Sequence, residues 1–180
     1  MLTPRDASLR PTSDRVKESM FNILGVEVEG KTVLDLFAGT GNLGIEAVSR
    51  GAERVVFVEK DREAVKLIEK NLFLCKMGDQ SEVLHKDVGQ AIGYLNRRGE
   101  RFGLVLMDPP YEKGLIQETL NQLKADKIYR DDSVLVIEHI RREPLPDLSR
   151  SWTLIRQRKI GDTLISFLTP VTEGKKKVKG

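Results

Sequence analysis

The chain has 180 residues, of which 39% are hydrophobic and 32% charged, and its formal net charge is +3 at pH 7. This length suits one domain, and this balance of apolar and charged residues excludes a wholly disordered chain. No apolar run approaches the roughly 20 residues that a membrane-spanning helix needs, and the first ten residues lack the apolar stretch of a secretory signal, so we expect a cytoplasmic protein. The single cysteine excludes a disulfide framework or a cysteine-rich zinc site within the chain.

Strand and helix patterns alternate along most of the chain. Apolar strands are predicted at 31–37, 54–59, 81–86, 103–108 and 133–139. Helices are predicted at 13–24, from the turn at 39–44 to about residue 50, and at 61–76, 87–98 and 114–125. Strands at 152–160 and 163–168 follow, joined by the turn Gly161-Asp162. The pattern predicts an α/β fold, in which helices cover both faces of a mostly parallel sheet and a C-terminal hairpin adds an antiparallel strand.

The C-terminal end carries most of the excess positive charge. Four lysines lie within 175–180, so we expect one domain over 1–170 and a disordered tail over 171–180. A second basic bias runs from Arg141 to Lys159, with six basic and two acidic residues. The tail and this segment are both candidates for contact with RNA phosphate.

A glycine-rich loop follows the first predicted strand. Gly39, Gly41 and Gly44 form a G-x-G-x-x-G pattern, and Glu59 ends the next strand. This context is typical of nucleotide binding, because the glycines let the backbone approach a ligand and the acid can accept from ribose hydroxyls. Asp35, before the loop, would repel a diphosphate and attract a cation, which favours S-adenosylmethionine over a dinucleotide.

Two further strand ends carry candidate site residues. Asp87 follows the third strand, where it can accept from the adenine amine and also cap a helix. The fourth strand ends in Asp108-Pro109-Pro110-Tyr111. The prolines fix the backbone, so that the Asp108 carboxylate and the Pro109 carbonyl can accept the two N–H groups of an exocyclic amine while the aromatic ring stacks on its base. The pattern therefore predicts methyl transfer to a planar amine by orientation and electrostatics.

The remaining reactive side chains give weaker signals. Cys75 is predicted to lie in the core on the apolar side of a helix, which argues against a thiolate nucleophile. His85 and His139 are isolated and are expected to be structural or at the surface. For Glu138, near the end of the fifth strand, a place in the site and a core or ion-pair role are equally open.

These motifs resemble those of class I S-adenosylmethionine-dependent amino-methyltransferases. The stretch from Arg10 to Asn22, RPTSDRVKESMFN, resembles the N-terminal signature of the bacterial RsmD family, the small-subunit (16S) rRNA guanine-N2 methyltransferases. With the matching segments 43–47 and 49–52, the similarity covers roughly 9–170. The resemblance implies a Rossmann-like, seven-stranded sheet of order 3-2-1-4-5-7-6 and methylation of the N2 amine of a guanine in rRNA.

The resemblance also implies roles for particular residues. Catalytic roles fall to Asp108, Pro109, Pro110 and Tyr111. S-adenosylmethionine would be bound by Asp35, Phe37, Ala38, Gly39, Thr40, Gly41, Glu59, Lys60, Asp87 and Val88. The substrate would lie near Arg10, Thr12 and Arg15. The expected partner is rRNA within a small-subunit assembly intermediate, with no metal and no membrane, and the expected state is a monomer. Only nine residues precede the signature, where the family usually has a basic segment, and the lysine tail could compensate.

Several alternatives remain open from the residues. The same Pro-Pro geometry serves methylation of adenine N6 or of a protein glutamine, although enzymes of the latter kind typically have Asn in place of Asp108. The G-x-G-x-x-G pattern alone also fits an NAD-type oxidoreductase, against which Asp35 and the Asp108–Tyr111 turn argue. A non-catalytic RNA-binding assembly factor is the last alternative, and the intact turn argues against it.

Overall fold

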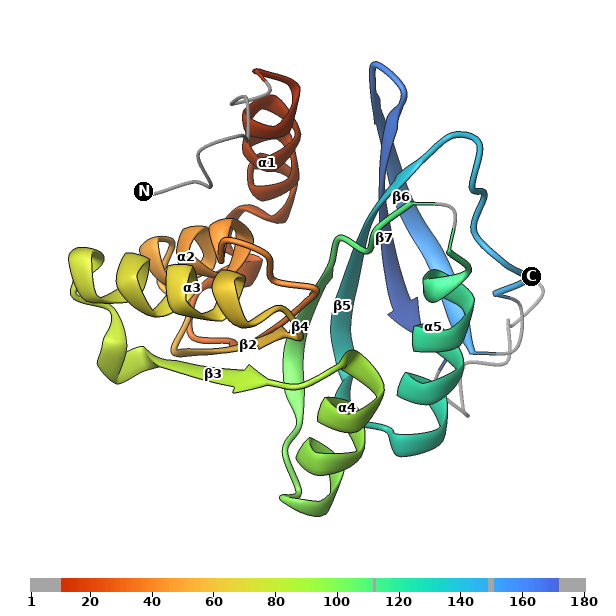
Figure 1. Cartoon of the computed structure of the whole chain (residues 1–180). Coiled ribbons are helices and arrows are strands. Elements are labelled where there is room, and N and C mark those ends of the chain that lie inside the picture. Colours follow the sequence, from red (N-terminus) through yellow and green to blue (C-terminus); the bar gives the residue numbers. More distant parts are fainter. Residues whose placement is uncertain (1–10, 112, 149–150, 172–180) are drawn as a thin grey trace.

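The fold is described from a computed structural model, which places residues 11–111, 113–148 and 151–171. Within these ranges, five main helices and seven strands follow one another (Figure 1). The helices are α1 (Pro11–Leu24), α2 (Asn42–Ser49), α3 (Arg62–Cys75), α4 (Val88–Arg97) and α5 (Leu115–Asp126), and short 3-10 turns cover Gly25–Val28 and Gly78–Gln80. The strands are β1 (Thr32–Leu36), β2 (Arg54–Glu59), β3 (Ser81–His85), β4 (Phe102–Met107), β5 (Tyr129–Ile140), β6 (Trp152–Ile160) and β7 (Thr163–Pro170).

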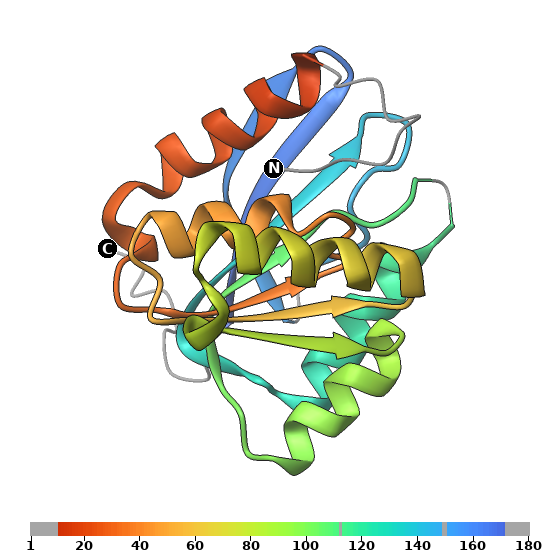
Figure 2. The same ribbon diagram turned by 60° about the vertical axis from the view of Figure 1, so that its left-hand side comes forward.

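The strands form one sheet of order β3-β2-β1-β4-β5-β7-β6, which confirms the predicted topology. Strands β1 to β5 are parallel, and β7 runs antiparallel between β5 and β6. Helices α1, α2 and α3 cover one face of the sheet, and α4 and α5 cover the other (Figures 1 and 2). Parallel strands buried on both faces place their carboxyl ends along one edge, where ligands bind in such folds.

The predicted element bounds are confirmed to within a few residues, and the largest difference is at the start of β5. That strand begins at Tyr129, four residues before the predicted start. The exposed residues Arg130, Asp131 and Asp132 hide the strand pattern in the sequence. Tyr129 itself pairs with Phe102 of β4, and its ring lies 4.7 Å from that of Trp152, so contacts from distant segments extend the strand.

The prediction that Cys75 lies in the core is wrong. Cys75 is a free, exposed cysteine at the last position of α3. Ile68 and Leu72 continue the buried face of α3. The helix ends after Cys75, because Lys76 takes a left-handed conformation. Met77 then turns back to pack against the core. The buried face of α3 therefore ends at Leu72, one turn before the predicted inward position at Cys75.

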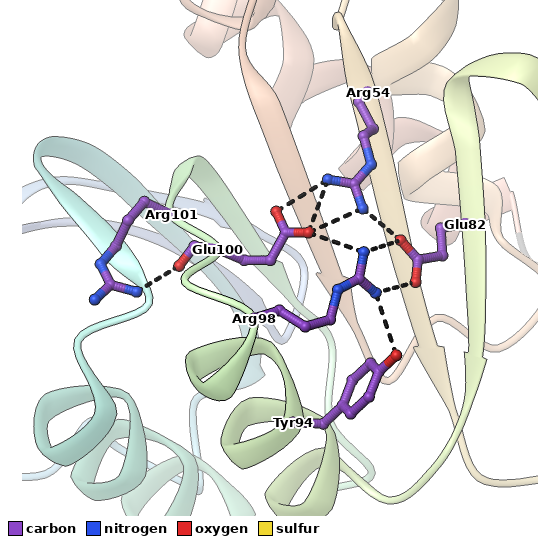
Figure 3. A network of polar contacts seen from close by, with 6 residues as sticks. All are labelled: Arg54, Glu82, Tyr94, Arg98, Glu100 and Arg101. Carbon is purple, nitrogen blue, oxygen red and sulfur yellow. Dashed lines mark hydrogen bonds and ion pairs between the residues drawn. The ribbon is translucent and has the colours of Figure 1, made fainter.

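A network of ion pairs stabilises the amino-terminal edge of the sheet, opposite the edge where the parallel strands end (Figure 3). Arg54 at the start of β2 pairs with Glu82 of β3, and its Nη1 lies 3.0 Å from Glu100 Oε2. Arg98, which caps α4, reaches both carboxylates and stands over the ring of Tyr94. These arginines join β2, β3 and the segment before β4, so their charges are neutralised by ion pairs within the fold. No helix in the described ranges is long and apolar enough to cross a membrane.

Candidate active site

The loop between β1 and α2 is built around a buried acid. Asp35 is 1% exposed, and its Oδ2 accepts the backbone N–H of Gly44 at 2.8 Å. Gly44 has no room for a side chain, since a Cβ there would lie 2.2 Å from the ring of Phe57. Gly41 caps α2 with φ of 79°, a left-handed conformation that favours glycine. The glycine pattern therefore serves close packing of helix on strand as well as the shape of the loop.

Glu59 connects this loop to the end of β2. Its Oε2 accepts the N–H of Gly39 at 2.8 Å, and its Oε1 accepts the N–H of Asp61 at the same distance. Two backbone donors thus hold the carboxylate in one orientation at the carboxyl edge of the sheet. Such an acid can still accept from ligand hydroxyls, because each carboxylate oxygen has more than one acceptor position.

Asp87 follows β3 and caps α4. Its Oδ1 accepts the N–H of Gln90 at 2.9 Å, which leaves the second oxygen for other donors. The cap and the predicted adenine contact are compatible on the same carboxylate. The neighbouring Lys86 places its ammonium 5.3 Å from the centre of the Tyr94 ring.

The end of β4 brings two carboxyl groups together. Asp108 follows Met107, which pairs with Ile137 of β5, so Glu138 comes at the same level of the adjacent strand. Burial raises the pKa of the Asp108 carboxyl to about 6. Burial first, and the charge of Asp108 second, raise the pKa of Glu138 to about 8, although a hydrogen bond from Tyr111 favours its ionised form. Glu138 therefore interacts with Asp108 through charge and with Tyr111 through a hydrogen bond, which makes it a candidate residue of the site.

The same electrostatic cluster extends to β1. The pKa of Asp35 is raised to about 7, mainly by burial and further by the charges of Asp108 and Glu59, against the lowering effect of the Gly44 hydrogen bond. Like charges in a poorly solvated region disfavour simultaneous ionisation. The carboxyl edge of β1, β2, β4 and β5 therefore carries an excess of acid that a cationic ligand would relieve.

A cavity of about 660 Å³ opens at this edge, on the face of the sheet that α4 and α5 cover. It brings together predicted residues from four strand ends: Phe37, Gly39, Glu59, Lys60, Asp87, Val88, Asp108, Pro109, Pro110 and Tyr111. Four predicted cofactor residues do not line it, namely Asp35, Ala38, Thr40 and Gly41. Of these, Asp35 supports the loop from behind, and the carbonyl of Thr40 accepts from Asn71 Nδ2 at 3.2 Å.

Part of the cavity wall was not predicted. Helix α5 contributes Leu115, Glu118, Thr119 and Gln122, and Val58, Lys86 and Gly89 complete the lining. Gln122 donates to the carbonyl of Gly89 at 2.8 Å and so joins α5 to α4 across the cavity. The only signal in the sequence is position, because α5 begins four residues after Tyr111, at the edge where the strands end.

The predicted substrate residues lie elsewhere or are not described. Arg10 lies outside the described residues, as does the side chain of Thr12, while the exposed Arg15 lines a second cavity on the other face. Of the tail over 171–180, only Val171 is described. His139 is structural, with its Nε2 2.8 Å from Ser166 Oγ. Within the described ranges, no group of three or more His, Cys, Asp or Glu is arranged to hold a metal ion.

A family model described as "Conserved hypothetical protein 95" matches residues 1–169 of the chain. The chain belongs to this family. The resemblance to the RsmD family is thereby confirmed, because relatives over most of the chain carry that family's name. Ribosomal RNA small subunit methyltransferase D of Escherichia coli (strain K12) is 35% identical over 88% of this chain and 78% of its own. Its namesake from Haemophilus influenzae is 33% identical over 85% of this chain and 79% of its own.

Solved structures agree with this assignment. A conserved hypothetical protein of Streptococcus pyogenes is 33% identical, with a TM-score of 0.78 over 85% of this chain and 94% of that one. TrmN from Thermus thermophilus, at 18% identity and a TM-score of 0.71 over 91% of this chain and 51% of its own, shares the fold. The chain is a member of a methyltransferase family with the class I arrangement of strands.

Proposed function

We propose that this protein transfers a methyl group from S-adenosylmethionine to the exocyclic N2 amine of a guanine in small-subunit rRNA. The observation that carries the proposal is the shared cavity. Asp108 and Tyr111, suited to hold a planar amine, line the same space as Glu59 and Asp87, suited to hold an adenosine. The relatives named as small-subunit rRNA methyltransferases support the choice of substrate.

The cavity fits S-adenosylmethionine by its hydrogen-bond acceptors and its apolar surface. Glu59 would accept from the ribose hydroxyls and Asp87 from the adenine amine, while Phe37 and Val88 offer apolar contact. A structure of the same fold, SMU.776, has been solved complexed with SAH, at 15% identity and a TM-score of 0.71. When bound, the cofactor supplies an activated methyl group on a sulfonium, so the protein needs no covalent intermediate of its own.

In this proposal Asp35 acts on the cofactor indirectly, through the glycine loop and through its charge. Its carboxylate stands behind the glycine loop, in contact with the amide of Gly44, and does not line the cavity. A positive charge in front of the loop would lower its raised pKa and favour the ionised form. Asp35 thus contributes a charge that complements the cationic cofactor while it holds the loop in shape. Direct contacts from Ala38, Thr40 and Gly41 stay predictions.

The chain's own residues then prepare the amine. An ionised Asp108 accepts one N–H of the guanine amine and the Pro109 carbonyl accepts the other, which turns the nitrogen lone pair out of the ring plane. Tyr111 stacks on the base, and its hydroxyl donates to Glu138, which fixes the ring. Orientation and electrostatic stabilisation supply the catalysis. Asp108 is the residue placed to take up the proton that the amine loses.

The proposal is tested by methylation with labelled S-adenosylmethionine. The purified protein is incubated with small-subunit assembly particles, with free rRNA, with DNA and with a mixture of cellular proteins, and the products are hydrolysed and separated. We expect label in N2-methylguanosine from rRNA, with assembly particles as the better substrate. Label in N6-methyladenosine, in glutamine or in none of the substrates would overturn the proposal. Action on an assembly intermediate in the cytoplasm and as a monomer stay predictions.

A further inference from the structure

A second cavity, of about 630 Å³, lies on the other face of the sheet, between α1 and the β6–β7 hairpin. Four cationic residues line it, Arg15 from α1 and Arg156, Arg158 and Lys159 from β6, and we call it the basic groove. Ile23 and Ile160 also line it and pack against the core below, whereas Glu18 is the one acid among its lining residues. The predicted basic bias of 141–159 and the predicted substrate residue Arg15 thus meet at one site.

The register of the hairpin explains how the arginines enter the groove. Arg156 pairs with Phe167 and Arg158 with Ile165, and both partners belong to the core cluster beneath α1. Cross-strand partners share a face of the sheet, so the two arginines stand on the face that α1 covers. Because β6 is the last strand and α1 covers it only in part, their guanidinium groups remain exposed.

Within the part of the chain that the structure describes, the cations of the basic groove are not paired with acids. Within the described ranges, none of its four cations has an ion pair or a hydrogen bond with an acid. Arg54 and Arg98, in contrast, are each paired with both Glu82 and Glu100 (Figure 3). On α1 itself, Lys17 contacts Asn42 and Glu46. The basic groove therefore holds positive charge that no acid of the described residues neutralises through an ion pair.

The basic groove reaches the same edge of the sheet as the candidate active site. The hairpin turns at Gly161-Asp162, and Arg141, just after β5, donates its N–H to the carbonyl of Asp162. Strands β5 and β7 separate β4, which Asp108 follows, from β6, so these two strands lie three strand spacings apart, or about 14 Å. Figure 2 shows the start of α1 beside the hairpin turn at this edge.

We propose that the basic groove binds the phosphate backbone of the RNA whose base enters the active site. The identity of that RNA rests on the proposed function, whereas binding of RNA as such does not. Guanidinium groups suit phosphate because they offer several donors in a fixed plane. Contacts of this kind position the nucleic acid without reading its sequence. The groove would thus hold the strand while Tyr111 and Asp108 hold the target base.

A protective role is the main competing explanation. Charged residues on an edge strand also prevent pairing with other chains. Either sign of charge serves that purpose, and it does not need a cation from α1 facing the strand. The two explanations differ in outcome, because loss of protection causes association between copies whereas loss of a phosphate site weakens RNA binding.

The test measures binding of radiolabelled small-subunit rRNA transcript to full-length protein over a range of salt concentrations. We expect R156Q/R158Q to bind at least about fivefold more weakly at moderate salt. Each lost phosphate contact lowers the salt slope by about 0.7 for a single strand, so the slope should fall by roughly 1.4. The charge-preserving R156K/R158K should keep most of the affinity and the slope.

The matched control is K124Q/R130Q, which removes the same charge from exposed positions at the end of α5 and the start of β5. Equal losses in both double variants, or an unchanged affinity and slope in R156Q/R158Q, would overturn the inference, as would association between copies with normal RNA affinity. S-adenosylmethionine affinity, measured in parallel, should be unchanged. RNA binding is measured without turnover, so a failure of the proposed reaction would leave this result standing, and the reverse also holds.

Discussion

The buried carboxylate of Asp35 accepts the N–H of Gly44 across the first turn of α2, at 2.8 Å. One acid at the end of β1 thereby fixes the loop that forms one side of the cavity. The same burial that makes this hydrogen bond strong also makes ionisation of the acid costly, since its pKa is raised to about 7. The stability of the fold and the charge of the site are therefore linked through one residue.

The first prediction concerns stability against pH without cofactor. Between the ordinary pKa of 3.8 and the raised value of about 7, unfolded chains release the Asp35 proton while folded chains keep it. The free energy of unfolding should therefore fall as pH rises through this window, by up to a few kcal/mol, since each pKa unit is worth about 1.4 kcal/mol. Asp35→Asn should make this dependence shallower, whereas Asp79→Asn, at an exposed position, should not. Denaturant unfolding between pH 4 and 8 checks this, and equal slopes in all three proteins would contradict it.

The second prediction separates catalysis from cofactor binding. Asp108→Asn should lower turnover by on the order of a thousandfold, because the amine loses its anionic acceptor. Affinity for S-adenosylmethionine should change by only a few-fold, since Glu59 and Asp87 line another part of the cavity. Single-turnover methylation and calorimetric titration measure the two quantities. A fully active variant would remove Asp108 from the assigned role.

The third prediction is a two-step pH dependence of the single-turnover rate. Asp108 and Glu138 share a poorly solvated site, and their pKa values are raised to about 6 and about 8. The rate should rise as pH increases through 6, because Asp108 must be ionised to accept from the amine. The change in the rate that ionisation of Glu138 causes near pH 8 should disappear in Glu138→Gln, while the rise in the rate near pH 6 remains. A rate that does not vary between pH 5 and 7 would refute this assignment.

The sequence predicts the sheet and its candidate active edge because both depend on local signals. Buried strands alternate with helices, and most of the predicted site residues lie at or just after the end of a strand, where the topology brings the ends together. Cys75 and the start of β5 were not predicted correctly, since a left-handed Lys76 and a contact between Tyr129 and Trp152 decide them. Both depend on backbone conformation or distant partners.

The residues of the candidate site that the sequence did not predict also depend on distant partners. Glu118 and Gln122 of α5 face the cavity, yet along the chain they read as polar positions of an ordinary amphipathic helix. Glu138 stayed open because one acid among apolar strand residues does not reveal its neighbours. The adjacent end of β4 and the hydroxyl of Tyr111 supply that information only in the folded chain.

The fourth prediction divides the functions of Tyr111. Tyr111→Ala should raise the KM for RNA roughly tenfold or more, because stacking of one base on an aromatic ring is worth about 1–3 kcal/mol. Tyr111→Phe keeps the ring and should have a mild effect on KM. It also removes the donor to Glu138, so the change near pH 8 should move upward, since the hydrogen bond lowers the pKa of that carboxyl. Steady-state kinetics across pH provide both readouts, and equal KM values for the two variants would argue against stacking.

The fifth prediction compares two helical glycines by their surroundings. In Gly44→Ala the new Cβ would lie 2.2 Å from the Phe57 ring, so α2 must move away from β2, which should cost about 1–3 kcal/mol of stability. In Gly93→Ala of α4 the nearest atom is Arg97 Nη1 at 3.5 Å, an ordinary contact. That variant should gain roughly 0.5–1 kcal/mol, because alanine favours a helix interior. Denaturant unfolding measures both, and a destabilised Gly93→Ala would mean that α4 is packed more tightly than its contacts indicate. Since α2 also carries the loop at Gly39, only Gly44→Ala should weaken S-adenosylmethionine binding.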